Sequence, residues 1–429
     1  MRPSGNLDGN GPLYRPVSRR GFLEAATTIA VAAPLLAHPI IPGVRNLDMD
    51  GDPRLRAEAR LPLEGFLEHY AGLIRERRIR IGCSFSPESL GVDGPRVGER
   101  GKARALRVLQ AAVEDLGMAD IRLGLRWSNL APNGADLTTF YAPYLDYCFR
   151  NASVRTVALD FGPLKTFRWP EIHVPQPVLD GLDSVPGDTA EIRPQMAVAQ
   201  RGLEHLGRAV AFVGQEYDGA KPVTISLNEP FHGFGRFSWT MSEAYLLEVL
   251  DVVLGSGHFA DAGVLVNSAQ GLDLHRIAAF FQQLVRQRPE LRGRLTSGFD
   301  IYPFLPPMSH FPVLKQLLGN IRAHKRDWSQ QVGPNLEWAH DPEAGYRIEV
   351  TEAQAEPFGD HPLVGNSLPH FQHVLAECFD KILDPDQDES LIRLFGIEYQ
   401  LRLQLSGRAA PDNLAILELT RRINELGAR

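Results

Sequence analysis

Short apolar runs alternate with longer amphipathic segments along the chain from residue 79 onward. The apolar runs are rich in β-branched residues and predict strands, whereas apolar positions spaced three and four residues apart predict helices between them. This alternation is typical of βα units that build a parallel sheet. We predict strands at 79–85, 120–126, 154–161, 223–229, 262–267, 296–302, 346–352 and 391–398, and helices that include 63–77, 103–116, 195–213, 243–254, 274–288 and 371–382.

Eight strands interleaved with helices predict an α/β fold, a (β/α)₈ TIM barrel that forms a single catalytic domain over residues 77–429. A doubly wound open sheet is the alternative arrangement of βα units. It is disfavoured because the turn after the first predicted strand lacks the G-x-G-x-x-G pattern of dinucleotide-binding sheets. The sequence also contains no internal repeat of the length that solenoid proteins use.

The fourth predicted strand ends in an unusual way. Its apolar residues 223–227 are followed by Asn228, Glu229 and Pro230. Proline lacks an N–H group and disfavours helix in the preceding residue, so the strand is expected to stop at Glu229. Side chains alternate between the two faces of a strand, so Asn228 and Glu229 can serve one pocket only if the backbone bends there.

Other strand ends carry polar and aromatic side chains of the same kind. Active sites of α/β barrels are built at the carboxyl ends of the strands, so these residues are candidates for one site. Two carboxyl groups on separate strands can divide the work of glycosidic cleavage, one as a proton donor and the other as an anion facing the anomeric carbon. The candidates are Arg126 and Trp127 after strand two, Lys165 and Trp169 in the irregular stretch 162–194 after strand three, Asn228 and Glu229 after strand four, Tyr302 after strand six, Glu352 and Gln354 on strand seven, and Glu398 on strand eight. Trp127, Trp169 and Trp239 are expected to stack on sugar faces.

This ordered set of strand ends resembles clan A glycoside hydrolases, in particular the cellulase-like and β-glycosidase-like branches. The resemblance implies a retaining mechanism on a (β/α)₈ barrel, with a carbohydrate substrate and without a metal or other cofactor. It implies Glu229 as the general acid/base, Glu352 as the nucleophile and Asn228 as a contact of the substrate 2-hydroxyl group. It also implies Tyr302 and Arg126 as partners of the nucleophile. The sequence departs from the family at strand three, which offers Lys165 in place of a histidine, and at strand eight, which carries Tyr399 where many relatives have tryptophan.

The amino-terminal 37 residues resemble a twin-arginine signal peptide. Arg19 and Arg20 precede Phe22 and an uncharged run from residue 25 to residue 37. That run is too short to span a bilayer as a helix, so we expect no membrane anchor. The resemblance implies that the twin-arginine export machinery recognises the precursor and that the protein is periplasmic or extracellular. A buried amino-terminal helix is the alternative, and residues 38–76 are interpreted as an amino-terminal extension of the barrel.

Composition restricts the choice of function. The 429 residues are 44% hydrophobic and 23% charged, with a formal net charge of −7, which is typical of a globular protein. Acidic and basic residues are mixed along the chain, and there is no basic tract of the kind that nucleic-acid binding requires. Cys83, Cys148 and Cys378 allow one disulfide but lack the spacing of a zinc site or a disulfide framework.

Two other functions remain open at this level. The first is a carbohydrate-binding protein on a barrel that has lost catalysis. The second is a metal-dependent barrel isomerase that uses Glu229, Asp300 and Glu352 as oxygen ligands. Glu349 is a rival for the seventh-strand carboxylate, but Arg347 is two residues away and a structural ion pair is the simpler interpretation. His232 is interpreted as a loop residue or a substrate contact, because neither it nor His310 has metal-ligand spacing.

Overall fold

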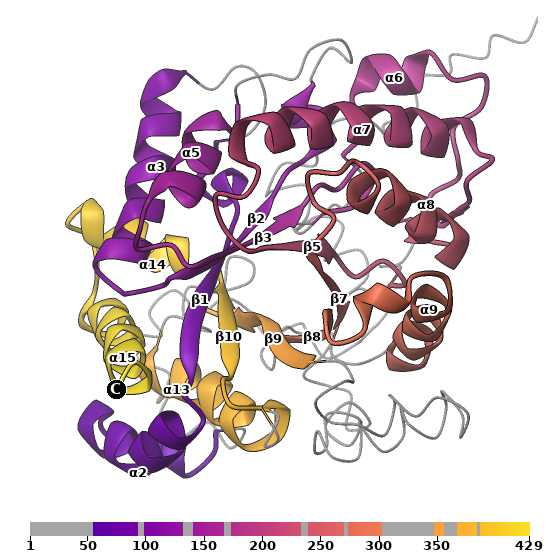
Figure 1. Cartoon of the computed structure of the whole chain (residues 1–429). Coiled ribbons are helices and arrows are strands. Elements are labelled where there is room, and N and C mark those ends of the chain that lie inside the picture. The colour runs from indigo at the N-terminus through magenta and orange to yellow at the C-terminus, as the bar shows by residue number, and fades with distance from the viewer. Residues whose placement is uncertain are drawn as a thin grey trace, which may run out of the picture. The chain divides into compact units, whose positions relative to one another are not determined.

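The computed structural model describes residues 55–92, 98–131, 140–166, 173–232, 239–269, 273–302, 347–355, 367–383 and 387–429. Eight parallel strands in these ranges close into a barrel (Figure 1), in which β10 pairs with β1. The predicted (β/α)₈ architecture is therefore confirmed, and closure of the sheet rules out the doubly wound alternative. The barrel strands are β1 (Arg80–Phe85), β2 (Asp120–Gly124), β3 (Thr156–Asp160), β5 (Val223–Leu227), β7 (Gly263–Ala269), β8 (Leu295–Ile301), β9 (Arg347–Gln354) and β10 (Leu391–Phe395).

Helices surround this barrel in Figure 1 and pack on it through one apolar face. In α3, for example, Ala105, Val108, Leu109 and Ala112 are buried and recur at helical spacing. A two-stranded sheet of β4 (Glu191–Ile192) and β6 (Thr240–Met241) lies outside the barrel sheet. The helices are α2 (Leu63–Glu76), α3 (Glu99–Glu114), α4 (Trp127–Leu130), α5 (Ala142–Arg150), α6 (Gln176–Asp180), α7 (Ala197–Tyr217), α8 (Glu243–Leu254), α9 (Leu274–Gln287), α13 (Leu368–Glu377), α14 (Ile397–Leu405) and α15 (Pro411–Gly427), with short 3₁₀ helices at Glu58–Arg60, Pro87–Leu90 and Pro289–Leu291 and a π-helical turn at Cys378–Ile382.

The eight predicted barrel strands and the six named helices are all present in the structure, and the differences lie at their ends. Helix α8 has the predicted bounds, and its first turn is capped by the Ser242 hydroxyl group, which accepts from the N–H of Tyr245. The last strand is shorter than predicted. It ends at Phe395 because Gly396 adopts a left-handed conformation, with φ of 86°, from which α14 begins. The apolar pattern through residue 398 therefore crosses a strand and the start of a helix.

The first described helix, α2, belongs to the predicted amino-terminal extension and packs against the last helix, α15 (Figure 1). Arg422 of α15 forms an ion pair with Glu64 of α2. Helix α15 is also anchored to the barrel, because the Asn424 amide group exchanges two hydrogen bonds with the backbone of Ile81. The two ends of the described chain thus meet beside β1.

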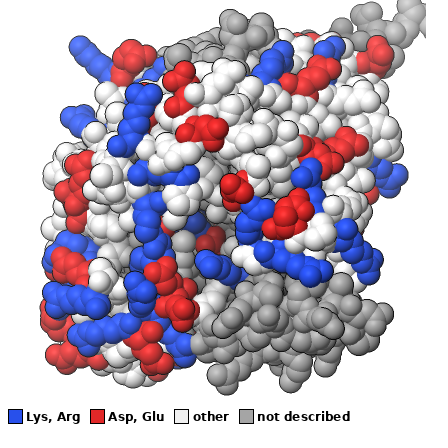
Figure 2. All heavy atoms as spheres, viewed as in Figure 1, with Lys and Arg blue, Asp and Glu red and all other residues white. Residues whose placement is uncertain are grey.

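Several sequence expectations fall outside the described residues. These are the twin-arginine segment 1–37, the first part of the extension 38–76, and Trp169, and all three stay predictions. No helix in the described part of the chain is long and apolar enough to cross a membrane. On the face shown in Figure 2, acidic and basic side chains are interspersed. The three cysteines are buried and unbonded, so the disulfide that the sequence allowed is not formed.

Candidate active site

The seventh barrel strand, β9, carries Glu352 and is irregular where this residue lies. Its pairing with β8 skips Thr351, because Val350 faces Phe299 and Glu352 faces Asp300. Thr351 fits there only because its neighbour is Gly298, where a β-carbon would lie 2.6 Å from Thr351 Cγ2. Thr351 and Glu352 are both buried beside this bulge at the carboxyl end of the barrel.

Both carboxylate oxygens of Glu352 are held by hydrogen bonds. Arg122 Nη1 donates to Oε1 at 2.6 Å, and the Tyr302 hydroxyl group donates to Oε2. Burial raises the pKa of Glu352, opposed by the positive charge of Arg122 and reinforced by the negative charge of Glu229. The geometry therefore brings Tyr302 and Glu352 together, as the sequence predicted.

Arg122 lies at the centre of the site and is completely buried. It projects from the middle of β2 and donates to side chains on or directly after β5, β7 and β9. In addition to its bond with Glu352, its Nε donates to Ser226 Oγ at 2.9 Å, and its Nη2 donates to Asn228 Oδ1 at 2.7 Å. The planar guanidinium group thus fixes the relative positions of β2, β5 and β9.

The expectation that Arg126 is the partner of Glu352 needs correction, since Arg122 occupies this place among the described residues. Strand β2 ends at Gly124, and Arg126 lies beyond it, where α4 begins. Its Nε is 3.8 Å from Oε1 of Glu88, a buried carboxylate that also accepts from Asn129 and Tyr141. Arg126 therefore belongs to a polar cluster beside the loops that follow β1 and β2.

The fourth barrel strand, β5, ends at Leu227, and the backbone then turns sharply. Glu229 has a φ of 38°, a left-handed conformation that is uncommon for a residue other than glycine. This turn is the bend that the Asn228-Glu229 pair required. The charge of Glu229 contributes to the raised pKa values of Glu352, Tyr302 and Asp300, for each of which burial is the largest cause. Glu229 therefore belongs to the same electrostatic environment as Glu352.

Asn267 and Asp300 connect the two carboxylate-bearing strands. Asn267 Nδ2 donates to Asp300 Oδ2 at 2.7 Å and to Asn228 Oδ1 at 3.0 Å. The other Asp300 oxygen accepts from Thr351 Oγ1 at 2.7 Å. Burial, followed by the charges of Glu352 and Glu229, raises the pKa of Asp300. Asp300 thus orients its neighbours.

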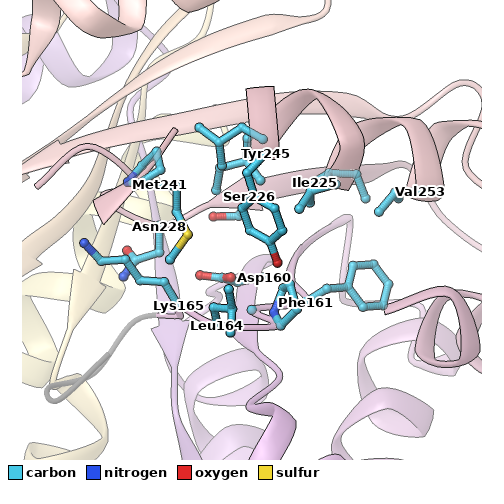
Figure 3. Close-up of a pocket in the computed structure, with 16 residues that line it drawn as sticks. Asp160, Phe161, Leu164, Lys165, Ile225, Ser226, Asn228, Met241, Tyr245 and Val253 are labelled. Carbon is cyan, nitrogen blue, oxygen red and sulfur yellow. The ribbon is translucent and has the colours of Figure 1, made fainter. Parts of the chain in front are cut away.

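A small cavity of about 30 Å³ adjoins this network between β3, β5 and α8, and Figure 3 shows the side chains that line it. Asp160, the last residue of β3, contributes a buried carboxyl group to its wall. Its Oδ2 accepts no hydrogen bond from the described residues, and Arg122 Nη2 lies 3.7 Å away. Burial raises the pKa of Asp160 to about 7, with Arg122 opposing the shift and Glu352 adding to it.

Lys165 and Trp127 are placed differently from what the sequence suggested. The Lys165 ammonium group donates to the backbone carbonyl groups of Glu229 and His232, so it binds the turn after β5. Trp127 is buried in α4 and stacks on His205 of α7, with ring centroids 5.1 Å apart. Trp239 is also buried, and its Nε1 donates to Gly187 O at 2.9 Å. Neither described tryptophan presents a free face for sugar stacking.

The remaining candidates lie at the edge of the network or outside it. Gln354 is the buried last residue of β9, paired with Phe395 of β10. Glu398 is buried in the first turn of α14, where its charge adds to the burial that raises the pKa of the Cys83 thiol. Its expected place at a strand end was wrong because Gly396 ends the strand earlier. Glu349 forms an ion pair with Arg393 of β10, so its structural role is supported, although the partner is not Arg347.

Arg122, Asn267 and Asp160 were missed from the sequence. Arg122 does leave a signal, because it interrupts the apolar run of a strand that is buried on both faces, where a charged side chain needs partners. Asn267 gives a weaker signal of the same kind. No sequence rule distinguishes Asp160 from an aspartate that ends a strand for structural reasons.

Two of the three carboxylates that a metal-dependent isomerase would use are engaged with protein donors. Glu352 accepts from Arg122 and Tyr302, and Asp300 accepts from Asn267 and Thr351. Within the described ranges, no group of three or more histidine, cysteine, aspartate or glutamate side chains is arranged to hold a metal ion. An adjacent arginine also makes this an unfavourable place for a cation.

No family model matches the chain, and no curated protein matches it. Solved structures with a similar fold include endo-glycoceramidase II from Rhodococcus sp., at 13% identity and a TM-score of 0.39 over 75% of each chain. An exo-β-1,4-mannosidase from Opitutaceae bacterium strain TAV5 is 13% identical, with a TM-score of 0.47 over 81% of this chain and 60% of that one. A cellulase, Cel5C_n, is 13% identical, with a TM-score of 0.43 over 80% and 86%. Likeness at this level carries no information about substrate or activity.

Proposed function

We propose that this chain is a retaining glycoside hydrolase that cleaves O-glycosidic bonds by double displacement, without a metal or cofactor. The observation that carries the proposal is the setting of Glu352, whose two oxygens are held by Arg122 and Tyr302. Glu229 follows another strand and lies within its electrostatic reach. A nucleophilic carboxylate needs both features: donors that favour its anion and orient it, and a second carboxyl group that supplies the proton.

In the first step, Glu352 attacks the anomeric carbon while the Glu229 carboxyl group protonates the departing oxygen. A glycosyl ester forms on Glu352, and the alcohol leaves with the proton of Glu229. In the second step, Glu229 removes a proton from water as that water attacks the anomeric carbon. The ester bond breaks, Glu352 becomes an anion again beside Arg122, and Glu229 regains its proton.

Asn228 is oriented so that it can contact the sugar in both steps. Arg122 can only donate, so the atom of Asn228 that it contacts at 2.7 Å must be the oxygen. Asn267 donates to the same oxygen. These bonds leave the amide nitrogen of Asn228 available as a donor, as a contact with the substrate 2-hydroxyl group requires.

The test compares three glutamine variants on a panel of aryl glycosides with leaving groups of different acidity. Glu352→Gln should lower kcat at least about a thousandfold on every substrate, because no glycosyl ester can form. Glu229→Gln should retain first-step reactivity on acidic leaving groups and lose it on poor ones, because only poor leaving groups need the proton. Glu349→Gln is the matched control on the same strand and should leave the kinetics unchanged.

Stereochemistry provides an independent measurement. We expect proton NMR of the first product to show retention, and a liganded crystal structure to place the two carboxyl groups about 5–5.5 Å apart. An inverted product would contradict the double displacement. Sugar binding without hydrolysis of any panel member would favour a carbohydrate-binding protein instead.

A further inference from the structure

The backbone at Glu229 is strained, and this strain has a structural explanation. Arg78 and Glu229 are the two described residues other than glycine with a positive φ. A left-handed conformation is energetically unfavourable for such a residue and persists only where the surrounding structure enforces it. Arg78 lies in a surface turn, whereas Glu229 is the proposed general acid. Contacts on both sides of Glu229 hold it in this conformation.

The peptide N–H group of Glu229 is held by Asn267. It donates to Asn267 Oδ1 at 3.1 Å. Asn267 cannot easily rotate away, because its Nδ2 is bound to Asp300 Oδ2 at 2.7 Å and to Asn228 Oδ1 at 3.0 Å. Arg122 Nη2 adds a longer bond of 3.3 Å to Asn267 Oδ1. The N–H group of residue 229 is thus fixed by the Asn267 side chain, whose own oxygen and nitrogen atoms are both hydrogen-bonded.

The carbonyl group of Glu229 is held by Lys165. The Lys165 Nζ donates to this carbonyl and also to that of His232, and the His232 N–H group donates back to Glu229 O at 3.0 Å. Lys165 is buried, and no described carboxylate lies within ion-pair distance of it. Figure 3 shows it beside Asn228. A buried ammonium group directed at two backbone carbonyls has a cost in desolvation that a surface lysine would avoid.

We propose that Asn267 and Lys165 are positioning residues that clamp residue 229 from both sides in its left-handed conformation and thereby aim the Glu229 carboxyl group at the substrate. The catalytic part of this inference rests on the proposed function. In an extended conformation, side chains of successive residues point to opposite faces, and Glu229 would leave the pocket that Asn228 faces. Neither positioning residue needs to touch the substrate for its loss to affect proton transfer.

The kinetic test uses Lys165→Met and Asn267→Ala, with Ser226→Ala as the matched control. Ser226 contacts Arg122 in the same network but neither side of residue 229. Both clamp variants should lower kcat on poorly acidic leaving groups at least about a hundredfold and on activated aryl glycosides less than about tenfold. The Ser226 variant should affect both classes equally. Equal losses in the clamp variants, or a general rise in KM, would mean that these residues bind substrate or merely support the fold.

A stability test measures the effect of the clamp without an enzyme assay. Each clamp variant is combined with Glu229→Gly, which tolerates a positive φ, and separately with Glu229→Gln, which keeps the β-carbon but removes the charge. We expect Lys165→Met to lower the Tm clearly less in the glycine background than in the wild type, and by the same amount in the glutamine background. A smaller decrease in Tm in both backgrounds would indicate that Lys165 acts by attracting the charge of Glu229. An undiminished decrease in Tm in both backgrounds would overturn the clamp.

These measurements separate the two proposals. If the glycine background alone relieves the loss of Tm and no glycoside is hydrolysed, the clamp stands and the proposed function fails. If Lys165→Met does not fold, Asn267→Ala provides the same comparison. Hydrolysis with additive stability effects would leave the function intact and reject the clamp.

Discussion

The two ends of the barrel contain buried carboxyl groups in opposite electrostatic states. At the amino end, Asp120 begins β2 and is held by Arg155 at 2.8 Å and by Arg80 at 3.3 Å. Glu389, just before β10, pairs with the same two arginines. At the carboxyl end, one guanidinium group, that of Arg122, lies among Glu352, Asp160 and Asp300.

Burial alone does not explain this difference, because Asp120 and Asp160 are both about 1% exposed. Burial acts to raise the pKa of each. Around Asp120 the arginines and the Thr156 hydroxyl group overcome that effect and lower the pKa, whereas around Asp160 a single arginine does not. The balance of charges therefore favours the anion of the buried carboxyl group at the amino end of the barrel and the protonated form of Asp160 at the carboxyl end.

The largest expected effect comes from removing the arginine at each end. Arg122→Met should lower kcat/KM at least about a hundredfold, because Glu352, the proposed nucleophile, loses a charged donor. Arg155→Met should leave kcat/KM unchanged and lower only the free energy of unfolding. Steady-state kinetics and urea denaturation of both variants check this pair. Equal losses of activity would remove the functional distinction between the two ends.

A second prediction concerns the pH dependence of stability at the carboxyl end. Folded Asp160 keeps its proton from about pH 4 to pH 7, where the unfolded chain has released it, so this residue makes wild-type stability fall as the pH rises through that range. Asp160→Asn removes this loss. The variant should gain up to about 4 kcal/mol relative to the wild type between pH 4 and pH 8. If denaturation curves gave the same difference in stability between the variant and the wild type at every pH in this range, the raised pKa of Asp160 would be contradicted.

The amino end should show the opposite sign. Because the pKa of Asp120 is lowered, its contribution to the free energy of unfolding is complete at neutral pH. This contribution is lost as the pH falls below the pKa that Asp120 has in the unfolded chain, near 4. Asp120→Asn should therefore cost about 3 kcal/mol at pH 7, and less in acid, because two arginines lose a buried partner. Denaturation at pH 7 and pH 3 measures the change. A cost that grows in acid would be inconsistent with this assignment.

The smallest effect is expected for an exposed ion pair, which serves as the reference for both ends. Arg150 and Asp146 lie four residues apart on α5 at 3.5 Å, with both side chains largely in solvent. Arg150→Ala should change the free energy of unfolding by less than about 0.5 kcal/mol. A larger change in the same denaturation assay would show that an ion pair can stabilise the fold without being buried.

The sequence by itself determined the barrel. Apolar runs and helical periodicity are local consequences of which residues face the core, so eight strands and the helices between them could be predicted with errors of a few residues at their ends. Asn228, Glu229, Tyr302 and Glu352 could also be predicted as neighbours, because the carboxyl ends of parallel strands meet at one edge of the barrel.

Only the tertiary structure decided which side chains meet. Arg122 lies four residues before the arginine that the sequence favoured, and its selection depends on the pleat of β2 and the distance across the barrel. The bulge at Thr351 depends on a glycine in the neighbouring strand, and the turn at Glu229 depends on an asparagine of β7 and a lysine of the loop after β3. These are contacts between residues far apart in the chain. No local pattern encodes them, because each partner acquires its role only when closure of the barrel brings the others within hydrogen-bonding distance.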